Sequence, residues 1–327
     1  LNGIRSLLLH HGIASHVHER HNGSYRLRIS GAQFDRYVTD IGFVTDRKQS
    51  AAEKHLTPDR NTNVDVIPNA GPTLRRLRES LGLTQYECGV PRRTYRHYEA
   101  GTRNPSRDAL GQIVDAFEDA CRSSTDATDD GLAQTDGGST ARDVAALRQL
   151  VESDVRWDRI ESIERVDPED DWVYDLEVAG THNYVSNGVV SHNSQMISYV
   201  ENIAPRSVYT SGKGSSSAGL CVTGDTTIHT EEGFKPIREL VTSELPDPVS
   251  TETAVEKAIG VRTFDRERGE MVNADSSHLW RMPESPCRRI ETQHGKELEA
   301  STQTPVLVCG PDGIEWREIS EIEAGDH

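Results

Sequence analysis

A His-Asn-Ser triplet at residues 192–194 combines three side chains that together could break and remake a peptide bond. The carboxamide nitrogen of Asn193 can close on its own main-chain carbonyl to form a succinimide, provided that the carbonyl is polarised and the departing amine is protonated. Histidine is the side chain best suited to that proton transfer near neutral pH, and His192 is adjacent. Ser194 supplies a hydroxyl that can accept an acyl group. The triplet therefore has the groups for autocatalytic cleavage and acyl transfer, but on its own it is a weak signal, because such a triplet usually belongs to an ordinary loop.

The residues before this triplet predict the strands that would position it. Apolar side chains at Val173, Leu176 and Val178 are typical of a strand, and a glycine-containing turn follows them. A second short strand is expected to end at the Asn-Gly pair 187–188. We therefore expect the triplet to follow directly on a pair of strands.

Residues 172–194 as a whole resemble the C-terminal splicing motifs of inteins, which sit on the all-β Hint fold. Five positions carry over: the charged assistants are Asp175 and His182, the penultimate His is His192, the cyclising residue is Asn193, and the first residue of the flanking host sequence, the extein, is Ser194. The resemblance also implies an order of events. A branched ester forms on Ser194 first, and Asn193 then cyclises and releases the intein.

The composition predicts several small domains in an acidic, salt-adapted protein. A chain of 327 residues could hold about two or three domains, but only 34% of its residues are hydrophobic and 6% aromatic. Acidic residues outnumber Lys and Arg by 53 to 36, and the formal net charge is −17. High salt screens the repulsion between such charges, because the Debye length falls to about 3 Å at 1 M. We expect a salt-adapted cytoplasmic protein; the alternative is an acidic chain with disordered tails.

Cysteine and histidine spacing and hydropathy exclude several classes of protein. The five cysteines include no CxxC pair and no signal peptide precedes them, so neither a disulfide framework nor a zinc site is expected. The histidines between residues 10 and 21 lack the spacing of metal ligands, so no metal site is expected there. No apolar run approaches the length of a membrane span, and no membrane partner is expected. The sequence begins at Leu1 and stops at His327 inside a motif, which predicts a fragment.

Residues 1–62 predict a small α/β region. The expected elements are an amphipathic helix with apolar positions from 4 to 13, strands at 16–19 and 25–29, and a helix at 33–41 followed by Gly42. The region resembles the part of LAGLIDADG homing endonucleases that follows their second motif helix, with Lys48 at the family's basic, DNA-binding position. The metal-binding acidic residue of that motif would lie upstream. This chain alone is therefore not expected to cut DNA, whereas an intact endonuclease would use Mg²⁺. The alternative for Lys48 is a solvated surface lysine.

Residues 63–121 predict a small all-α module. Helical periodicity occurs three or four times, in the stretches 73–82, 83–89, 91–101 and 106–118. The arrangement resembles the Cro-type helix-turn-helix fold, in which the helix at 91–99 would be the recognition helix. That resemblance makes four residues candidates for contacts with DNA phosphates and base edges: Arg92, Arg93, Thr94 and Arg96. The second stretch is about a turn shorter than the family usually has. The alternative is a helical bundle with a solvated Arg-rich face.

Residues 122–142 predict an acidic linker, because they are mainly Ser, Thr, Asp and Gly with almost nothing apolar to bury. Residues 144–151 then predict a short amphipathic helix, and residues 157–166 lead into the strands described above. We assign residues 143–193 to the C-terminal Hint segment.

Residues 194–220 differ in character from their neighbours. They predict a helix that breaks at Pro205, a strand through Val208 and Tyr209, and a Gly/Ser loop. The stretch resembles the AAA+ core of minichromosome maintenance (MCM) replicative helicases just after the P-loop, which would make it a short α/β extein segment. In that resemblance Ser194 is also the hydroxyl that coordinates the Mg²⁺ of MgATP in the mature helicase.

Cys221 begins another distinct stretch, in which a thiol precedes a Gly-Asp turn, a strand, a second turn and an amphipathic segment. Residues 221–327 resemble the N-terminal part of a second intein. The resemblance implies that Cys221 attacks the carbonyl of Leu220 in an N-to-S acyl shift, for which a thiol is a good nucleophile near neutral pH. The family commonly has Thr-x-x-His in its second block, and Ser301 and Thr304 stand at those positions. Either the two hydroxyls replace the missing His or this step is slow.

We therefore expect a multi-domain fragment of an archaeal, halophile-like MCM DNA helicase precursor that carries inteins. Splicing would need no cofactor, and the mature host would be a DNA-binding homo-hexamer that hydrolyses ATP with Mg²⁺. The alternatives are a DNA-binding helix-turn-helix regulator and a stand-alone Hint autoprocessing protein. Because residues 143–193 and 221–327 would come from two different inteins, we expect their strands not to match as partners.

Overall fold

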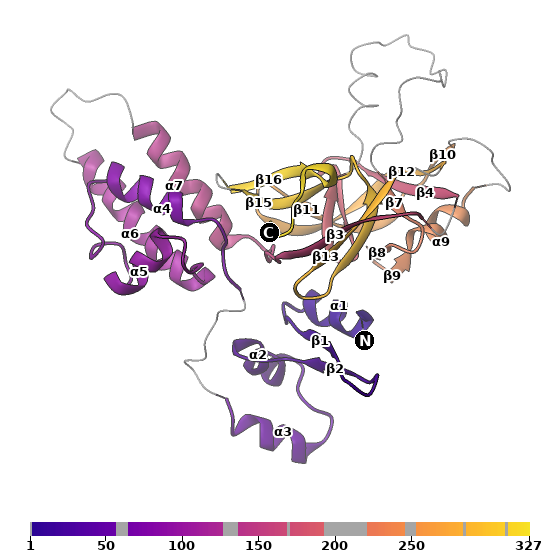
Figure 1. The fold of residues 1–327 in the computed structure, drawn as a ribbon, viewed down its shortest axis with the longest axis horizontal. Helices are drawn as coiled ribbons and strands as arrows, with labels where there is room; N and C mark the ends of the chain where they lie inside the picture. The colour runs from indigo at the N-terminus through magenta and orange to yellow at the C-terminus, as the bar shows by residue number, and fades with distance from the viewer. Residues whose placement is uncertain are drawn as a thin grey trace, which may run out of the picture. The chain divides into compact units, whose positions relative to one another are not determined.

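The computed structural model describes residues 2–56, 65–126, 137–168, 171–192, 221–245, 253–283, 286–310 and 313–327 (Figure 1). Its chain divides into two compact units. Unit 1 comprises residues 1–157 and 309–313, and unit 2 comprises residues 158–308 and 314–327. Among the described residues, no helix is both long enough and apolar enough to cross a membrane.

The first part of unit 1 is a small α/β arrangement. Its elements are α1 (Asn2–His10), β1 (His16–Glu19), β2 (Tyr25–Arg28), α2 (Ala32–Asp40) and α3 (Asp46–Glu53). Strands β1 and β2 form an antiparallel hairpin. Gly42 follows α2 with a φ of 75°, and its N–H donates to the Tyr37 carbonyl at 2.8 Å, which closes the helix end. The helices and strands predicted for residues 4–41 are confirmed, and α3, which carries Lys48, is an additional helix.

The second part of unit 1 is a bundle of helices. Its elements are α4 (Gly71–Ser80), α5 (Arg92–Glu99), α6 (Arg107–Asp126) and α7 (Gly137–Glu152). Tyr95 of α5 is fully buried, and its hydroxyl donates to the Leu74 carbonyl of α4 at 3.0 Å. The other large core residues are apolar: Leu77, Leu110, Ile113 and Phe117. Helices α6 and α7 lie side by side, and α7 also contacts α4. The boundary assigned at residue 143 therefore falls inside a helix of this unit.

The helix expected at residues 83–89 is wrong, because the segment forms turns and bends instead. Gly82 and Gly89, with φ values of 67° and 75°, bound a stretch of less than about two helical turns. The Glu87 carboxylate accepts hydrogen bonds from the Thr84 N–H at 2.8 Å and from its hydroxyl at 2.7 Å. These local bonds fold the segment into a turn that competes with a helix.

The linker expected at residues 122–142 is wrong in part, because α6 and α7 both extend into it. Residues 127–136 lie outside the described part of the chain. Arg148 of α7 donates to the Glu118 carboxylate of α6 at 2.9 Å, and Leu147 of α7 is buried. Tertiary contacts of this kind stabilise helices whose own sequences have little apolar surface.

Unit 2 is built from strands. They are β3 (Ile160–Val166), β4 (Trp172–Val178), β5 (Asn183–Ser186), β6 (Val189–His192), β7 (Val222–Thr223), β8 (Thr227–Thr230), β9 (Gly233–Pro236), β10 (Thr253–Glu256), β11 (Gly260–Asp265), β12 (Glu270–Pro283), β13 (Cys287–Thr292), β14 (Glu297–Ser301), β15 (Pro305–Gly310) and β16 (Gly313–Glu318). Helix α9 (Ile237–Thr242) and the 3₁₀ turn η1 (Ile319–Glu321) accompany them. The described strands form one 14-stranded sheet in the order β16-β15-β6-β5-β8-β11-β12-β4-β7-β14-β13-β3, with β10 on β12 and β9 on β8. The all-β expectation for the Hint segments is confirmed.

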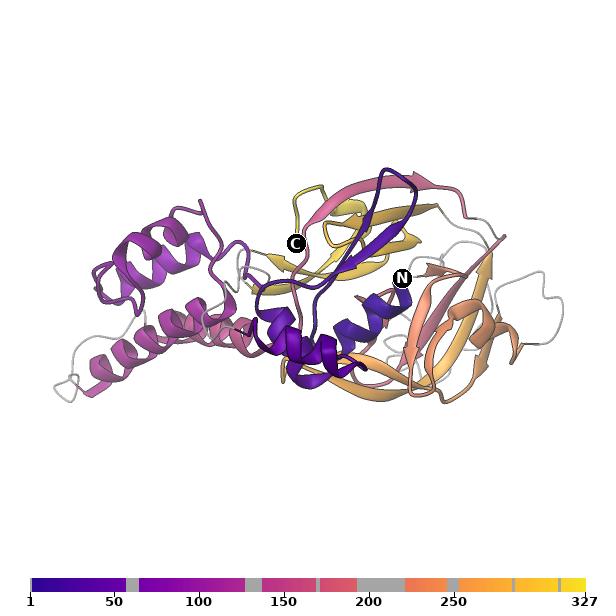
Figure 2. The ribbon, with the colours of Figure 1, turned by 90° about the horizontal axis from the view of Figure 1, so that it is seen from below.

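Strands from the two sides of residues 193–220 alternate in this sheet. β4 pairs with β12 on one side and with β7 on the other, β3 pairs with β13, and β6 pairs with β15. Figures 1 and 2 show the pink strands of the earlier segment among the orange and yellow strands of the later one. The expectation that the two segments would not match is therefore wrong. Strand pairing joins main-chain N–H and C=O groups, which every residue except proline carries, so it demands little of the side chains.

The Asn187-Gly188 pair makes the tight turn between β5 and β6 and also joins the two segments. Both residues have positive φ, 48° and 79°, as a type I′ hairpin turn requires. The Asn187 side chain accepts the Thr227 N–H at 2.8 Å and donates to the Glu297 carbonyl at 2.9 Å. Lys296 donates to the Gly188 carbonyl at 3.0 Å. The hairpin turn expected from the sequence is confirmed, and it is also a bridge to β8 and β14.

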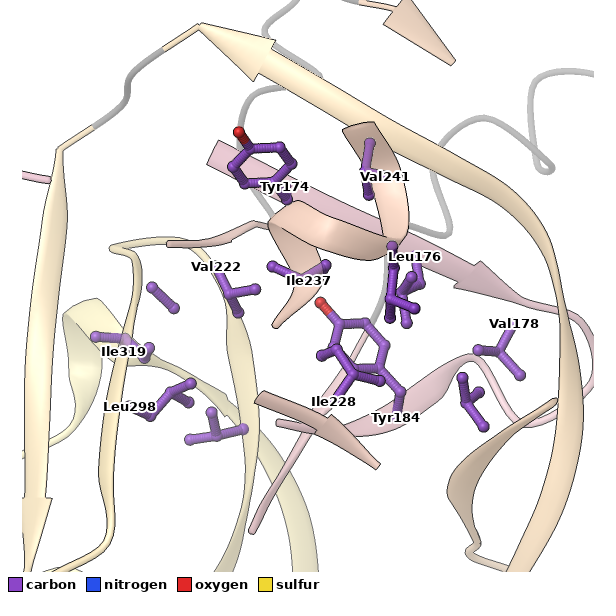
Figure 3. Close-up of a cluster of buried hydrophobic side chains, with 14 of the residues drawn as sticks. Tyr174, Leu176, Val178, Tyr184, Val222, Ile228, Ile237, Val241, Leu298 and Ile319 are labelled. Carbon is purple, nitrogen blue, oxygen red and sulfur yellow. The ribbon is translucent and has the colours of Figure 1, made fainter. Parts of the chain in front are cut away.

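The core of unit 2 draws on both segments as well. Tyr184 and Leu176 from the earlier segment pack with Ile228 and Ile237 from the later one, and all four are at most 1% exposed (Figure 3). Burial of such side chains contributes about 1.5–3 kcal/mol each relative to exposure. Neither segment alone can cover this core, so the two segments depend on each other for a folded sheet.

Candidate active site

Cys221 lies in a row of residues that runs across neighbouring strands from β12 to β13. The antiparallel register between β4 and β7 places Asp175 opposite Cys221. On the other side, Ser301 donates its N–H to the Cys221 carbonyl at 2.8 Å. The row continues through Cys287, the register partner of Ser301, and through Trp280, the register partner of Asp175. Cys221, Asp175 and Ser301 are each at most 2% exposed, so this row is closed to bulk water.

Two hydroxyl groups hold the main-chain amide of Cys221. Its N–H donates to Oγ1 of Thr304 at 3.1 Å and to Oγ of Ser301 at 3.4 Å. The Thr304 hydroxyl donates to the Cys221 carbonyl at 3.1 Å, and the two hydroxyl oxygens are 2.8 Å apart. This nitrogen belongs to the peptide bond between Leu220 and Cys221. The hydroxyl pair therefore contacts the atom that would leave if the thiol attacked the preceding carbonyl.

Asp175 accepts two hydrogen bonds on the same oxygen, Oδ1. One comes from the Leu176 N–H at 2.8 Å and the other from the Tyr184 hydroxyl at 3.1 Å. Burial raises the pKa of Tyr184 well above its usual value, and the negative charge of Asp175 raises it further. The charge of a Cys221 thiolate acts on the Tyr184 pKa in the same direction. Tyr184 is therefore a protonated donor in one electrostatic cluster with Asp175 and Cys221.

His192, at the end of β6, packs its ring edge-to-face with Trp316 of β16. The ring centroids are 4.8 Å apart and the planes meet at 83°. The β6–β15 register pairs Ser191 with Val306, which places His192 beside Pro305 and so next to Thr304 in sequence. The end of β6 and the Cys221 amide therefore both approach the turn between β14 and β15.

His182 lies in the turn between β4 and β5 with a φ of 52°, a left-handed conformation that non-glycine residues adopt infrequently. Its N–H donates to the Val178 carbonyl at 3.2 Å. The next residue, Asn183, pairs with His192 across the β5–β6 hairpin. His182 is therefore positioned beside the end of β6 rather than in the row of Cys221.

A comparison with known protein families identifies the family of the chain. The family model described as "Intein splicing domain" matches residues 25–193, just over half of the chain, and the match ends at Asn193. The chain belongs to the intein splicing-domain family. Autocatalytic protein splicing is the chemistry of that family, and the sequence prediction of an intein is confirmed.

Several curated proteins are similar to this intein. They include the replicative DNA helicase DnaB of Synechocystis sp. (29% identical, covering 58% of this chain and 20% of that protein), elongation factor 2 of Methanopyrus kandleri (24%, 60% and 14%) and DnaB of Nostoc sp. (50%, 52% and 17%). The chain thus spans about a fifth or less of the length of these relatives.

Three residues expected to react lie outside the described part of the intein. They are Asn193, Ser194 and Leu220. The whole segment 194–220, with its predicted helix and strand, also lies outside the described residues. Of the other predicted site residues, the structure brings Asp175, Cys221, Ser301 and Thr304 together, and it places His192 and His182 at the neighbouring end of β6.

Tyr184 and Trp316 are site residues that the sequence analysis missed. Tyr184 belongs to an ordinary strand pattern, and its hydroxyl meets Asp175 because β4 and β5 fold over one core. Trp316 lies far from His192 in sequence and meets it because β16 and β6 flank the same strand. A strand pattern predicts which face a residue takes but not which strand lies beside it.

No metal centre accompanies the site within the described residues, where no three His, Cys, Asp or Glu side chains gather in a way that could hold an ion. Thiol, hydroxyl, carboxyl and imidazole groups are the reactive side chains that the structure describes at this site.

The candidate DNA-contacting residues lie in unit 1. Arg92, Arg93 and Arg96 are exposed on α5, whereas Thr94 is half-buried. Lys48 is exposed on α3. The buried face of α5 carries Glu99, whose carboxylate accepts hydrogen bonds from three side chains: Arg75, Arg78 and Gln85. Burial raises the pKa of Glu99, but these donors outweigh it and the net pKa is lowered, so the acid stays ionised and neutralised inside the bundle.

Proposed function

We propose that unit 2 carries out protein splicing through a thioester at Cys221 and a succinimide at Asn193. The observation that carries this proposal is the pair of hydroxyls on the Cys221 amide, with Asp175 opposite the thiol-bearing residue. Nucleophile, proton acceptor and leaving-group contacts are then in adjacent strands, as acyl transfer requires.

The acyl shift at Cys221 follows from these contacts. The thiol gives its proton to the Asp175 carboxylate, and the sulfur attacks the carbonyl carbon of Leu220. The bond from that carbon to the Cys221 nitrogen then breaks, and the nitrogen takes a proton from the Thr304 hydroxyl, which the Ser301 hydroxyl contacts. The proton that Asp175 accepted from the thiol replaces the one that Thr304 gives, so the acyl shift neither gains nor loses a proton. A thioester now links Leu220 to the Cys221 sulfur. In this scheme the hydroxyl pair replaces the His that the family commonly has at position 304.

The second half of the reaction occurs at the end of β6. The Ser194 hydroxyl attacks the carbonyl carbon of the Leu220 thioester, and the bond from that carbon to the Cys221 sulfur breaks. An ester forms on Ser194, and the hydroxyl proton passes to the sulfur, which restores the Cys221 thiol. The carboxamide nitrogen of Asn193 then attacks its own carbonyl carbon, the bond to Ser194 breaks, and His192 donates a proton to the departing amine. An acyl shift from oxygen to nitrogen on Ser194 finally converts the ester into an amide. We assign to Trp316 the packing that orients the His192 ring, and to His182 support of the same step.

We further propose an MCM-type replicative helicase as the host, with Ser194 as a ligand of the Mg²⁺ in MgATP when splicing joins Ser194 to the host sequence before the intein instead of to Leu220. The support is the resemblance of residues 194–220 to that AAA+ core, together with two relatives whose names are replicative DNA helicase. The α/β region around Lys48 fits the remnant of a LAGLIDADG homing endonuclease. A homo-hexamer, ATP and DNA are then the partners and cofactors of the mature host.

Removing the Thr304 hydroxyl tests the proposed acyl shift. We expect Thr304→Ala to slow the dithiothreitol-dependent release of the fragment ending at Leu220 by about 10² to 10³-fold, because a preorganised contact to the reacting amide is lost. Thr304→Ser retains a hydroxyl and should remain within about tenfold of the wild-type chain. The measurement is the fragment mass against time.

Two controls bound this result. Cys221→Ala should release no Leu220 fragment with or without thiol, since it lacks the attacking sulfur. Ser320→Ala removes an exposed hydroxyl from η1 near the same turn and should behave like the wild type. Equal rates for Thr304→Ala and the wild-type chain would remove Thr304 from the mechanism.

Unit 1 supports a second candidate function, DNA binding through α5. The favouring observation is that Arg92, Arg93 and Arg96 are exposed together while the acid of the same helix, Glu99, is buried and neutralised. Tyr86, which is 75% exposed, lies under the Arg92 guanidinium at 5.2 Å. Such a surface offers cations to phosphates and an aromatic face to bases. Within an intein, this module would help an endonuclease hold its target.

Replacing the three α5 arginines tests this second function. We expect the combined replacement Arg92→Gln, Arg93→Gln and Arg96→Gln to weaken the salt dependence of DNA binding. The slope of log K, the DNA association constant, against log salt concentration should fall in magnitude by roughly three, about one for each lost phosphate contact. The measurement is fluorescence anisotropy of a duplex across a salt series. A charge-matched control replaces three exposed arginines on other elements, Arg122, Arg165 and Arg268, and should leave the slope nearly unchanged. Equal slopes in both triple variants would exclude α5 as the DNA-binding surface.

A further inference from the structure

The Tyr184 hydroxyl is a buried polar group that the splicing scheme above leaves unused. Tyr184 is 1% exposed, and its ring packs in the core beside Ile228 and Leu176 (Figure 3). From this apolar setting its hydroxyl donates to Oδ1 of Asp175 at 3.1 Å. A phenylalanine would fill the same core space, so the hydroxyl calls for an explanation beyond packing.

We propose that Tyr184 is a positioning residue whose hydroxyl orients the Asp175 carboxyl group and stabilises its ionised form, so that Asp175 can accept the thiol proton of Cys221 near neutral pH. This inference rests on the acyl shift proposed for Cys221. Tyr184 acts through Asp175 and takes no part in bond making itself.

The physical need for such a donor comes from burial. Asp175 is 2% exposed, and a carboxylate removed from water is stable only when hydrogen bonds or charges replace its hydration. The Leu176 N–H and the Tyr184 hydroxyl both end on Oδ1. Two donors on one oxygen fix the plane of the carboxyl group, and we assign its other oxygen, Oδ2, to the thiol proton of Cys221.

Other titratable and charged groups also lie on the elements packed against β4. They are Cys221 directly before β7, Tyr184 on β5, Arg238 and Glu239 on α9, and four residues on β12: Glu270, Asp275, His278 and Arg281. Arg281 stacks over the Trp172 ring at 4.8 Å, and His278 pairs with Glu177 at 3.3 Å. The Tyr184 hydroxyl is a side-chain donor to the Asp175 carboxylate. Removing that hydroxyl should therefore change the pH at which Asp175 ionises.

The first test is the pH profile of Tyr184→Phe. We expect dithiothreitol-dependent release of the Leu220 fragment to slow by about 10- to 100-fold at neutral pH, the value of one hydrogen bond to a charged group. When the pH is raised by about one to two units, the ratio of variant to wild-type rate should return toward one, because Asp175 of the variant then ionises without the Tyr184 donor. The thiols of dithiothreitol also ionise as the pH rises, and this effect cancels in the ratio because it is the same for both chains. Tyr174→Phe makes the same change in the same core, and its ratio should not vary with pH.

The second test does not depend on splicing. In the full chain with Cys221→Ala, carboxyl-¹³C aspartate gives an Asp175 resonance that is identified by its loss in Asp175→Asn. Its titration midpoint should rise by about one to two pH units when Tyr184→Phe is added, and should stay in place with Tyr174→Phe. An unshifted midpoint, or a pH-independent rate ratio, overturns the role of Tyr184. The two proposals can fail separately. If the Asp175 midpoint shifts in the Tyr184→Phe variant but the wild-type chain releases no Leu220 fragment, the role of Tyr184 is supported and the acyl shift at Cys221 is rejected.

Discussion

The Asn193→Ala chain is expected to keep the peptide bond between residues 193 and 194 intact. Without the carboxamide no succinimide can form, so release at this junction should fall below detection. His192→Ala should slow the same release by about 10² to 10⁴-fold without abolishing it, because general-acid help is lost while the attacking amide remains. The measurement is the mass of the products over time.

An internal control separates this effect from misfolding. Thiol-dependent release at Leu220 uses Cys221 and should persist in Asn193→Ala, since the row of Asp175, Cys221 and Ser301 is unchanged. Continued cleavage between residues 193 and 194 in Asn193→Ala would contradict the assignment of the cyclising residue. Loss of both activities together would indicate that the sheet has not formed.

A circular product made of residues 194–220 is the second large effect that we expect. The sheet alternates strands from both sides of this segment, and the end of β6 and the Cys221 amide both approach the Ser301–Thr304 turn. The Ser194 hydroxyl can then attack the thioester that holds Leu220, which returns the Cys221 thiol. Cyclisation of Asn193 would release the segment as a lactone, and the shift from oxygen to nitrogen closes it as an amide ring. Its mass is that of the linear segment minus one water.

The contacts between the two segments explain why we expect this product from the chain itself. Asn187 joins β8 and β14, Asp158 accepts the Thr292 hydroxyl at 2.8 Å and pairs with His294, and Glu177 pairs with His278. Ser194→Ala removes the acyl acceptor, so any released 194–220 segment should be linear. Cys221→Ala cannot form the thioester at Leu220, so it should release no 194–220 segment, linear or circular. A linear 194–220 segment from the wild-type chain, with no ring of lower mass, would show that the paired sheet does not bring the two ends together.

The local motifs of the candidate site could be recognised in the sequence because their residues are consecutive. The His-Asn-Ser triplet and the Asn187-Gly188 turn need only near neighbours to be recognised, and the structure confirms the turn. The contact between Tyr184 and Asp175 could not be predicted, because it depends on how β4 and β5 pack over a core completed by later strands. The hydroxyls of Ser301 and Thr304 could be located by their spacing, whereas their contacts with the Cys221 amide come from the β7–β14 pairing.

The incorrect expectations have two physical causes, competing local hydrogen bonds at residues 83–89 and long-range contacts in the other two regions. Residues 83–89 have a helical pattern, but the Thr84–Glu87 hydrogen bonds and two glycines with positive φ favour a turn. The Ser- and Asp-rich stretch looked unable to fold, yet α6 and α7 enter it because Arg148 and Leu147 anchor α7 in the bundle. The segments expected to mismatch pair through their main chains, which sequence difference does not prevent.

The position of β4 between β7 and β12 has a consequence for the time at which the reaction can begin during synthesis. Both neighbours of β4 are made after residues 193–220, and so is the Ser301–Thr304 turn. A ribosome adding about 5–20 residues per second needs roughly 5–20 s to proceed from Asn193 to Thr304. Until then Asp175 and His192 have no completed sheet around them. With the chemistry proposed for Asn193, we therefore expect the order of translation to protect this junction until the sheet is complete, so that an unfinished chain does not cut itself.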